Sequence, residues 1–302
     1  MLNQPSPPPK PIAEVWRPDL VALPRLTLWR RVFRTFFRGF TKLLVLVTLR
    51  TRISGLENFP KQGPAIIVFN HLGDADAILL SATLPFSPIE GIGKIELYDH
   101  WLVGPVFRAY GIIWVHRGQP DRKAIRAALN GLSEGRMLTL APEGRQSLTG
   151  GLEEGEDGAA FLSVKSGAPI VPVALTGLEN KNVFGHLKRW KRAPVSLTIG
   201  KPFFLRENPQ GDRQKMIREG TRQIMESLAC VRPLRLAAIA ALGLGHGDPR
   251  FRCQPLHHLR ERQSFRLHHE GEDVAVLAGG ETVIKALVVI DEERRRLFRF
   301  EG

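Results

Sequence analysis

The most informative part of the chain is the stretch Ile66-Ile67-Val68-Phe69-Asn70-His71-Leu72-Gly73-Asp74-Ala75-Asp76. Its β-branched, apolar first half predicts a buried strand. His71 follows in the loop, and a helix that starts near Asp74 would hold Asp76 in its first turn. The Asp76 carboxylate could then reach one ring nitrogen of His71, fix the tautomer and leave the other nitrogen free to accept a proton. The stretch therefore predicts a general base that needs no metal.

Strands and helices alternate along the chain after this stretch. We expect strands at 64–69, 92–94, 112–116, 137–140, 170–175 and 195–199, and helices at 76–83, 97–110, 121–133, 158–165 and 212–228. This order predicts an α/β fold in which helices flank a layered, mostly parallel sheet. Ligands bind at the carboxyl ends of strands in such sheets, and His71, Arg117 and Glu143 all fall at strand ends.

The composition restricts the class of protein. A chain of 302 residues can bury one good-sized core and a smaller appendage. Its net charge of +13 favours an anionic partner, which could be nucleic acid, an anionic membrane or a phosphorylated substrate. Cys230 and Cys253 provide no disulfide framework and favour a reducing compartment. No apolar run approaches the roughly 20 residues of a membrane span, and the N-terminus shows no signal-peptide pattern.

Four segments follow from the distribution of residue types. Residues 1–24 are rich in proline and predict a flexible arm. Residues 25–52 predict an amphipathic helix at a membrane surface, with an aromatic stripe beside a cationic face of Arg31, Arg34, Arg38 and Lys42. The alternative is a helix docked on the core with a solvated basic face. Residues 53–230 form the α/β domain, and 231–302 form an extension of unknown role.

Within that extension, residues 274–277 and 283–290 are expected to pair as strands, with Gly279-Gly280 in or beside the turn. Its histidines, including the pairs His257-His258 and His268-His269, do not have the spacing of a metal site.

Further residues suggest chemistry at the strand ends. Arg117 offers a guanidinium group to a phosphate, and Gly118 lets the backbone approach closely. The run from Gly131 to Gly135 matches the G-x-S-x-G pattern of acyl hydrolases. That pattern requires a strand before the serine and a helix after it, whereas here a helix precedes and a strand follows. Asp74 is expected to cap the next helix, and His116 to be satisfied structurally.

Four motifs lie in order along the chain: Asn70-His71 with Asp76, the strand that ends at Arg117-Gly118, the run Pro142-Glu143-Gly144-Arg145-Gln146-Ser147, and the proline-containing strand at 169–173. Together they resemble a known family, the PlsC-like 1-acylglycerol-3-phosphate O-acyltransferases and related glycerolipid acyltransferases. Asn70-His71 with Asp76 matches the first motif, and the strand that ends at Arg117-Gly118 matches the second. The third corresponds to Pro142-Glu143-Gly144-Arg145-Gln146-Ser147, where the family's threonine is absent and the arginine is displaced by one position. The fourth is the proline-containing strand at 169–173. The resemblance covers about residues 26–228.

The resemblance implies a glycerol-3-phosphate acyltransferase-like fold and the transfer of a fatty acyl group to a free hydroxyl. His71 and Asp76 would be the catalytic pair. Substrate-binding roles would fall to Asn70, Lys94, Arg117, Gly118, Glu143, Gly144 and Arg145. Arg117 would bind the acceptor phosphate, and Lys94 is a further candidate for phosphate contact. The displaced arginine at Arg145 leaves the head group of the acceptor open.

The expected partners are a lysophospholipid, most simply lysophosphatidate, and a donor that is acyl-CoA or acyl-carrier protein. No cofactor, metal or nucleic acid is expected. The expected location is the cytoplasmic face of a membrane, as a monotopic or peripheral protein. The alternatives are an acyltransferase for another lipid head group and a catalytically silent lipid-binding protein at the membrane surface.

Overall fold

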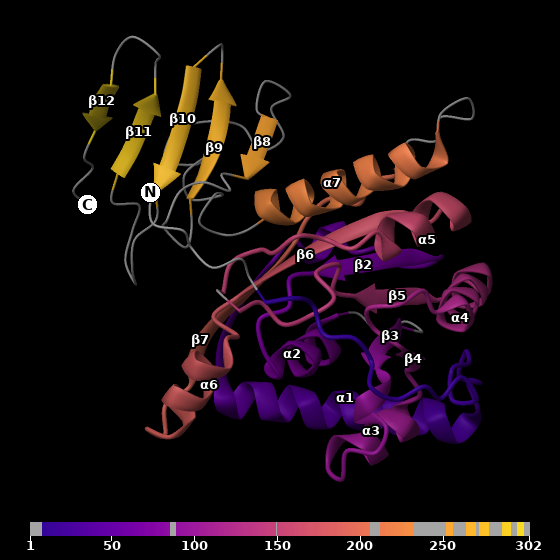
Figure 1. The fold of residues 1–302 in the computed structure, drawn as a ribbon. Helices are drawn as coiled ribbons and strands as arrows, with labels where there is room; N and C mark the ends of the chain where they lie inside the picture. Colours follow the sequence, from indigo (N-terminus) through magenta and orange to yellow (C-terminus); the bar gives the residue numbers. More distant parts are fainter. Residues whose placement is uncertain are drawn as a thin grey trace.

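A computed structural model describes residues 8–84, 89–148, 150–205 and 212–231, together with the backbone of five strands between residues 252 and 298. A seven-stranded sheet is the centre of the molecule, in the order β1-β7-β6-β2-β5-β3-β4 (Figure 1). The strands are β1 Leu49–Ser54, β2 Ala65–Phe69, β3 Ile89–Lys94, β4 Ile113–Val115, β5 Met137–Leu140, β6 Ile170–Thr176 and β7 Ala193–Ile199.

The five strands from β6 to β4 run parallel to one another, and the β6–β7 pair is antiparallel. The carboxyl ends of β2, β5, β3 and β4 therefore meet at one edge of the sheet. This result confirms the layered, mostly parallel α/β fold that the sequence predicts.

Helices cover both faces of the sheet because its central strands are apolar on both sides. Along β2, Ile66 and Val68 pack into one hydrophobic cluster, and Ala65 and Ile67 pack into the other. α4, α5 and α7 contribute to the first cluster, and α1, α2 and α6 to the second (Figure 1). The helices are α1 Leu28–Thr48, α2 Ala75–Thr83, α3 Val103–Tyr110, α4 Arg122–Ser133, α5 Gly158–Ser166, α6 Asn180–Leu187 and α7 Arg213–Val231, with short 3-10 helices at Leu56–Asn58 and Ile95–Leu97.

Most predicted elements lie within a few residues of the observed ones. The predicted helix at 97–110 starts too early, because a 3-10 turn and a bend precede α3, which begins at Val103. The predicted interfacial helix at 25–52 is too long, since residues from Leu49 onward belong to β1. Neither β1 nor α6 is among the predicted elements.

A buried charge network fastens α1 to the sheet. Arg34 donates to both carboxylate oxygens of Glu90, at 3.1 and 2.7 Å, and Arg136 donates to the same carboxylate at 3.0 Å. Arg34 also donates to the backbone oxygens of Tyr110 and Gly111, both at 2.9 Å. Glu90 is fully buried, and its charge is compensated by these two guanidinium groups.

This network corrects the predicted cationic face of α1. Arg34 is only 8% exposed and points into the protein, so it cannot contact lipid. Arg31 and Lys42 are exposed, and Arg38 is half-buried. The outer side of α1 instead carries a continuous apolar stripe of exposed side chains, namely Leu28, Trp29, Val32, Phe36, Phe40, Leu43 and Val47.

Residues 8–24 contact the domain over most of their length, whereas the sequence analysis predicted a flexible arm. The Ala13 N–H donates to the Arg117 oxygen at 2.9 Å, and the Pro24 oxygen accepts from Arg136 at 2.7 Å. Val21 is buried in the first hydrophobic cluster. An extended, proline-rich chain can dock in this way because its remaining backbone groups bond to the core.

The part of the predicted extension that the structure describes contains a second sheet, antiparallel and in the order β12-β11-β10-β9-β8. Its strands are β8 Arg252–Pro255, β9 Ser264–His269, β10 Glu272–Leu277, β11 Ala286–Ile290 and β12 Arg295–Phe298. β10 and β11 pair with Val274 opposite Val289, which confirms the predicted pairing. The predicted Gly279-Gly280 turn and the His257-His258 pair lie outside the described residues.

The Arg34 network predicts a large, local loss of stability. Arg34→Ala would leave the buried Glu90 carboxylate with one cation, and we expect the free energy of unfolding to fall by about 3 kcal/mol. Urea denaturation would measure this change. Arg31→Ala removes an exposed arginine from the same helix and should change stability by less than about 0.5 kcal/mol. Equal effects of the two substitutions would contradict the assigned role of the network.

Candidate active site

The His71–Asp76 pair forms as predicted. His71 Nδ1 lies 2.6 Å from Asp76 Oδ2, and Asp76 is fully buried at the start of α2. The same oxygen accepts the backbone N–H groups of Leu72 at 2.7 Å and Gly73 at 3.1 Å. These bonds hold the carboxylate in place, and the carboxylate in turn directs the Nδ1 proton of His71 toward itself. The His71 side chain is 30% exposed, so Nε2 remains accessible as a proton acceptor.

Glu143 connects the His71 loop to the loop after β5. Its Oε1 accepts the His71 N–H at 3.1 Å, and its Oε2 accepts the Glu153 N–H at 2.8 Å. The Ser147 N–H also donates to the His71 oxygen at 2.8 Å. Both oxygens of Glu143 are thus occupied by backbone groups, and the residue is fully buried. Its observed contacts position His71, and the predicted contact with substrate remains a prediction.

Burial raises the pKa of Glu143 from 4.5 to about 7, because the carboxylate loses its hydration. The two backbone N–H donors favour the charged form and oppose this shift, but they do not outweigh the desolvation.

Arg117 and Lys94 lie at the carboxyl ends of the strands on the far side of Glu143. Lys94 pairs in register with Val115, and Arg117 follows two residues later. The edge of the sheet therefore presents His71, Glu143, Lys94 and Arg117 in that order across four neighbouring strands, over about 14 Å at the usual spacing. Arg117 Nε is buried without a hydrogen-bond partner among the described residues. An anionic ligand would complete the hydrogen bonding of this nitrogen.

Arg145 lies near the site but already has partners. Its Nε bonds to Glu153 Oε2 at 2.6 Å, and its Nη1 donates to the Pro8 oxygen at 2.8 Å. The displaced arginine of the third motif is thus neutralised by an acid from the following loop. Gly144 has a φ of +71°, a conformation that glycine adopts without strain, and it turns the chain between Glu143 and Arg145.

Asn70 is buried beneath the His71 loop. Its amide donates to the Leu175 oxygen at 2.9 Å and accepts the Leu175 N–H at 2.7 Å, which ties the end of β2 to β6. These bonds position the loop that carries His71. Contact between Asn70 and substrate remains a prediction.

A second histidine–aspartate pair lies beside Arg117. His116 Nδ1 is 2.5 Å from Asp121 Oδ2, but the ring is buried and its Nε2 accepts the Arg17 N–H at 2.9 Å. Asp121 also caps α4 through Lys123 and Ala124. With both ring nitrogens occupied, His116 serves structure, as the sequence analysis predicted, and His71 is the accessible member of the two pairs.

The arm lies over the second motif. A Cβ at Gly118 would come within 2.9 Å of the Ile12 backbone, so the close approach that glycine permits here is used by the arm. The arm also reaches the acidic loop, where Lys10 Nζ lies 2.6 Å from Glu156 Oε1.

Several residues of the site were missed or misassigned in the sequence analysis. Asp74 precedes α2, but its carboxylate does not cap the helix; it accepts from Gln146 at 2.8 Å and Asn180 at 3.0 Å. Glu153 was missed although its backbone orders Glu143 and its side chain pairs with Arg145. The acidic, glycine-rich composition of residues 150–157 was its only signal. The partners of Asp74 lie far from it in the sequence, so local patterns do not indicate them.

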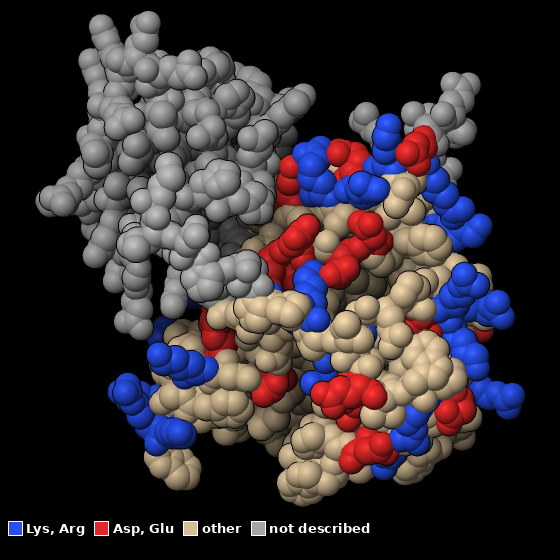
Figure 2. All heavy atoms as spheres, in the orientation of Figure 1, with Lys and Arg blue, Asp and Glu red and all other residues tan. Residues whose placement is uncertain are grey.

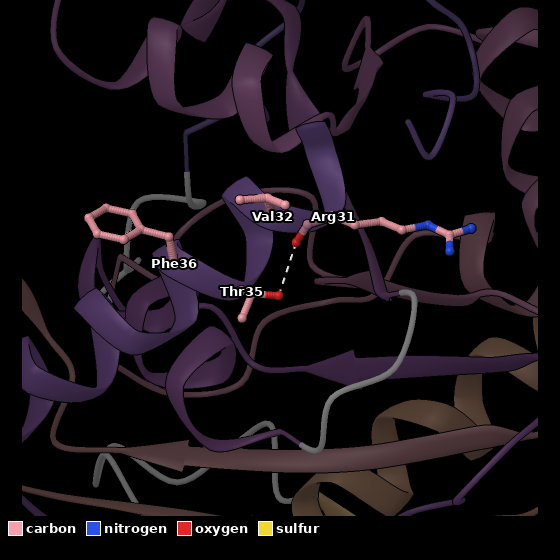
Figure 3. Close-up of a pocket in the computed structure, with 4 residues that line it drawn as sticks. All are labelled: Arg31, Val32, Thr35 and Phe36. Atoms are coloured by element: carbon pink, nitrogen blue, oxygen red, sulfur yellow. Dashed lines mark hydrogen bonds between the residues drawn. The ribbon is translucent and has the colours of Figure 1, made fainter. Parts of the chain in front are cut away.

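A hollow on the protein surface lies on α1 and not beside His71. It is lined by Arg31, Val32, Thr35 and Phe36, and Figure 3 shows Phe36 and Arg31 pointing in opposite directions from the helix. It belongs to the apolar outer side of α1, and an acyl groove at His71 remains a prediction. None of the described helices is both long and apolar enough to cross a bilayer. Within the same described residues, no three potential metal ligands gather.

The pKa of Glu143 predicts a pH dependence of stability. The folded protein binds this proton more tightly than the unfolded chain does, so stability falls as pH rises from 4.5 through about 7. Glu143→Gln removes the titrating group. The free energy of unfolding of the native protein, relative to the variant, should therefore fall by about 3 kcal/mol across this range. Urea denaturation at pH 4.5, 6 and 8 would measure it, and parallel curves for the two proteins would contradict it.

Comparisons with known proteins agree with this geometry. A family model described as "Acyltransferase" matches residues 50–176, which include every predicted site residue. The chain is 29% identical over 140 residues to the 1-acyl-sn-glycerol-3-phosphate acyltransferase of Borreliella burgdorferi, covering 45% of this chain and 55% of that protein. It is 27% identical over 171 residues to a probable enzyme of the same name from Mycoplasma pneumoniae, covering 53% and 60% respectively. The chain thus spans somewhat more than half the length of these relatives.

The crystal structure of the 1-acyl-sn-glycerophosphate acyltransferase PlsC from Thermotoga maritima shares the fold. The TM-score is 0.51 at 22% identity, with 72% of this chain and 83% of the other covered. The ordered motifs, the fold and the matching family model lead to one conclusion: residues 50–176 match the acyltransferase family, and the chain has the fold of a PlsC-like acyltransferase.

Proposed function

We propose that the protein transfers a fatty acyl group from a thioester donor to the free hydroxyl of a lysophospholipid, with lysophosphatidate as the acceptor. The observation that carries this proposal is the His71–Asp76 pair, whose accessible Nε2 lies at the same sheet edge as Arg117, a residue whose Nε has no hydrogen-bond partner in the part of the chain that the structure describes. A base and a phosphate-binding group so placed suit an acceptor whose hydroxyl lies near a phosphate. The names of the related acyltransferases support the same acceptor.

In the proposed reaction, His71 Nε2 removes the proton of the acceptor hydroxyl as its oxygen attacks the thioester carbonyl carbon. Asp76 stabilises the imidazolium that forms through its bond to Nδ1. The C–S bond then breaks, and the imidazolium proton passes to the leaving thiolate, so the products are an ester and a free thiol. Acyl-CoA and acyl-carrier protein both fit as donors, and the step uses no cofactor.

The apolar outer side of α1 supports a membrane surface as the site of reaction. The stripe from Leu28 to Val47 runs the length of the helix and presents aromatic and aliphatic side chains to solvent. An interfacial helix buries such a stripe among lipid chains. A peripheral or monotopic position at the cytoplasmic face would bring the site to its lipid substrates.

Loss of the base should abolish transfer without loss of the fold. His71→Gln is expected to lower kcat by about 10² to 10⁴, measured as thiol release from acyl-CoA with lysophosphatidate in detergent. His116→Gln makes the same change in the buried His116–Asp121 pair and should lower stability while transfer is retained. Full activity of His71→Gln would exclude the proposed base. Absence of thiol release from the native protein with any lysolipid would favour the silent lipid-binding alternative.

Arg117 should determine the preference for a phosphate-bearing acceptor. Arg117→Gln removes a charge-assisted contact, so kcat/KM for lysophosphatidate should fall by about 10-fold to 100-fold, while that for uncharged monoacylglycerol stays constant. The matched change Arg145→Gln should have a smaller effect, because Arg145 is already paired with Glu153. A larger effect at Arg145 than at Arg117 would indicate that the displaced arginine of the third motif selects the head group.

A further inference from the structure

The turn between α6 and β7 presents an exposed tryptophan in a conformation that favours glycine. Trp190 is 98% exposed and has a φ of 56°, the one positive value among the described non-glycine residues. The Trp190 N–H bonds to the Leu187 oxygen at 2.9 Å, and the Lys191 N–H to the His186 oxygen at 3.0 Å. This pair of bonds is a Schellman motif with Trp190 at the position where glycine is usual. Neither the backbone nor the packing of the domain benefits from the indole group.

Positive charge surrounds this indole. Lys188, Arg189 and Lys191 are all exposed, and the chain contains no acidic residue from 180 to 206. Figure 2 shows Lys and Arg side chains gathered at the lower left, over the α6–β7 turn of Figure 1. A tryptophan among lysines and arginines matches an anionic bilayer surface, where the ring lies at the level of the head groups and the cations contact phosphates.

The turn is attached to the end of α1. Leu49, which follows the last residue of α1, pairs with Ala193 at the start of β7. Arg192 donates to the Leu49 oxygen through Nε at 2.9 Å and Nη2 at 2.6 Å. Trp190 therefore lies close to the carboxyl-terminal end of the apolar stripe, where Leu43 and Val47 are exposed.

We propose that the α6–β7 turn, residues 188–191, is a second membrane contact that binds anionic lipid head groups and inserts Trp190 at the bilayer surface. The turn and the apolar stripe of α1 together hold the protein to the bilayer at two points. The proposal rests on the proposed function insofar as α1 is the first contact.

The tryptophan can be tested with a variant that suits the backbone. Trp190→Gly places glycine at its usual position, so the melting temperature should hold or rise. Binding to vesicles of phosphatidylcholine with 30% phosphatidylglycerol, measured by co-sedimentation of the full chain, should weaken by about tenfold because the indole no longer inserts. Unchanged binding would overturn the role of Trp190. A lower melting temperature would show that the indole serves the fold, and this result too would overturn the proposal.

The charges can be tested separately. Lys188→Gln with Lys191→Gln should weaken binding to the same vesicles by about 25-fold, since each basic side chain near an anionic surface contributes about 1 kcal/mol, or about fivefold. The effect should vanish on pure phosphatidylcholine. The matched variant Lys215→Gln with Arg218→Gln removes two exposed charges from α7, on the opposite face of the sheet, and should bind like the native protein. Equal losses of vesicle binding in the two double variants would mean that net charge alone accounts for the effect. This result would overturn the proposed site.

Failure of this inference is distinguishable from failure of the proposed function. Phe36→Ser with Phe40→Ser disrupts the α1 stripe, and thiol release in detergent tests the reaction without a membrane. If only the α1 variant loses vesicle binding and the turn variants keep it, the second contact is wrong and the proposed function stands. If detergent activity is absent from the native protein, the proposed function fails whatever the turn does.

Discussion

The site depends on one buried carboxylate. Glu143 holds the loop that carries His71 and the loop that carries Arg145, because its two oxygens accept a backbone N–H from each side. Without this bridge, the position of the His71 loop relative to the third motif would rest on the Ser147 bond to the His71 oxygen and the Gln146 bond to Asp74. The cost of burying the carboxylate is visible in its raised pKa. Glu143 takes no part in the proposed proton transfer, yet its hydrogen bonds control the position of the proposed base.

A second buried acid performs a comparable task for α1 and its exposed apolar stripe. Glu90 lies on β3 and joins Arg34 of α1 to Arg136 at the start of β5. The apolar stripe of α1 is thereby connected to the strands whose ends carry Lys94 and Glu143. The positions of the helix and the site are linked through buried side chains, so salt in the medium should screen this link little.

The sequence predicts the strands of the sheet better than it predicts the side-chain contacts of the site. Strands β2, β5 and β6 are continuous apolar runs because both of their faces are buried, and such runs are recognisable locally. β1 was missed because Arg50 and Arg52 make an edge strand appear polar. α6 was missed because it buries little, with Val183 as its buried residue and Gly185 in its interior. The His71–Asp76 pair was predictable because its partners lie five residues apart, whereas the partners of Asp74 and Arg145 come from distant loops. Helical spacing does not indicate that Arg34 is buried, since its acceptor, Glu90, lies on β3.

The docked arm, residues 8–24, lies beside the loop that carries the third motif. The Pro8 oxygen bonds to Arg145, and Lys10 pairs with Glu156 in the acidic loop. A fluorescent or spin label attached near residue 10 would therefore lie close in space to the third motif, although more than 130 positions separate the two in the sequence. The segment around residue 10 is thus a natural place for a spectroscopic reporter of ligand arrival.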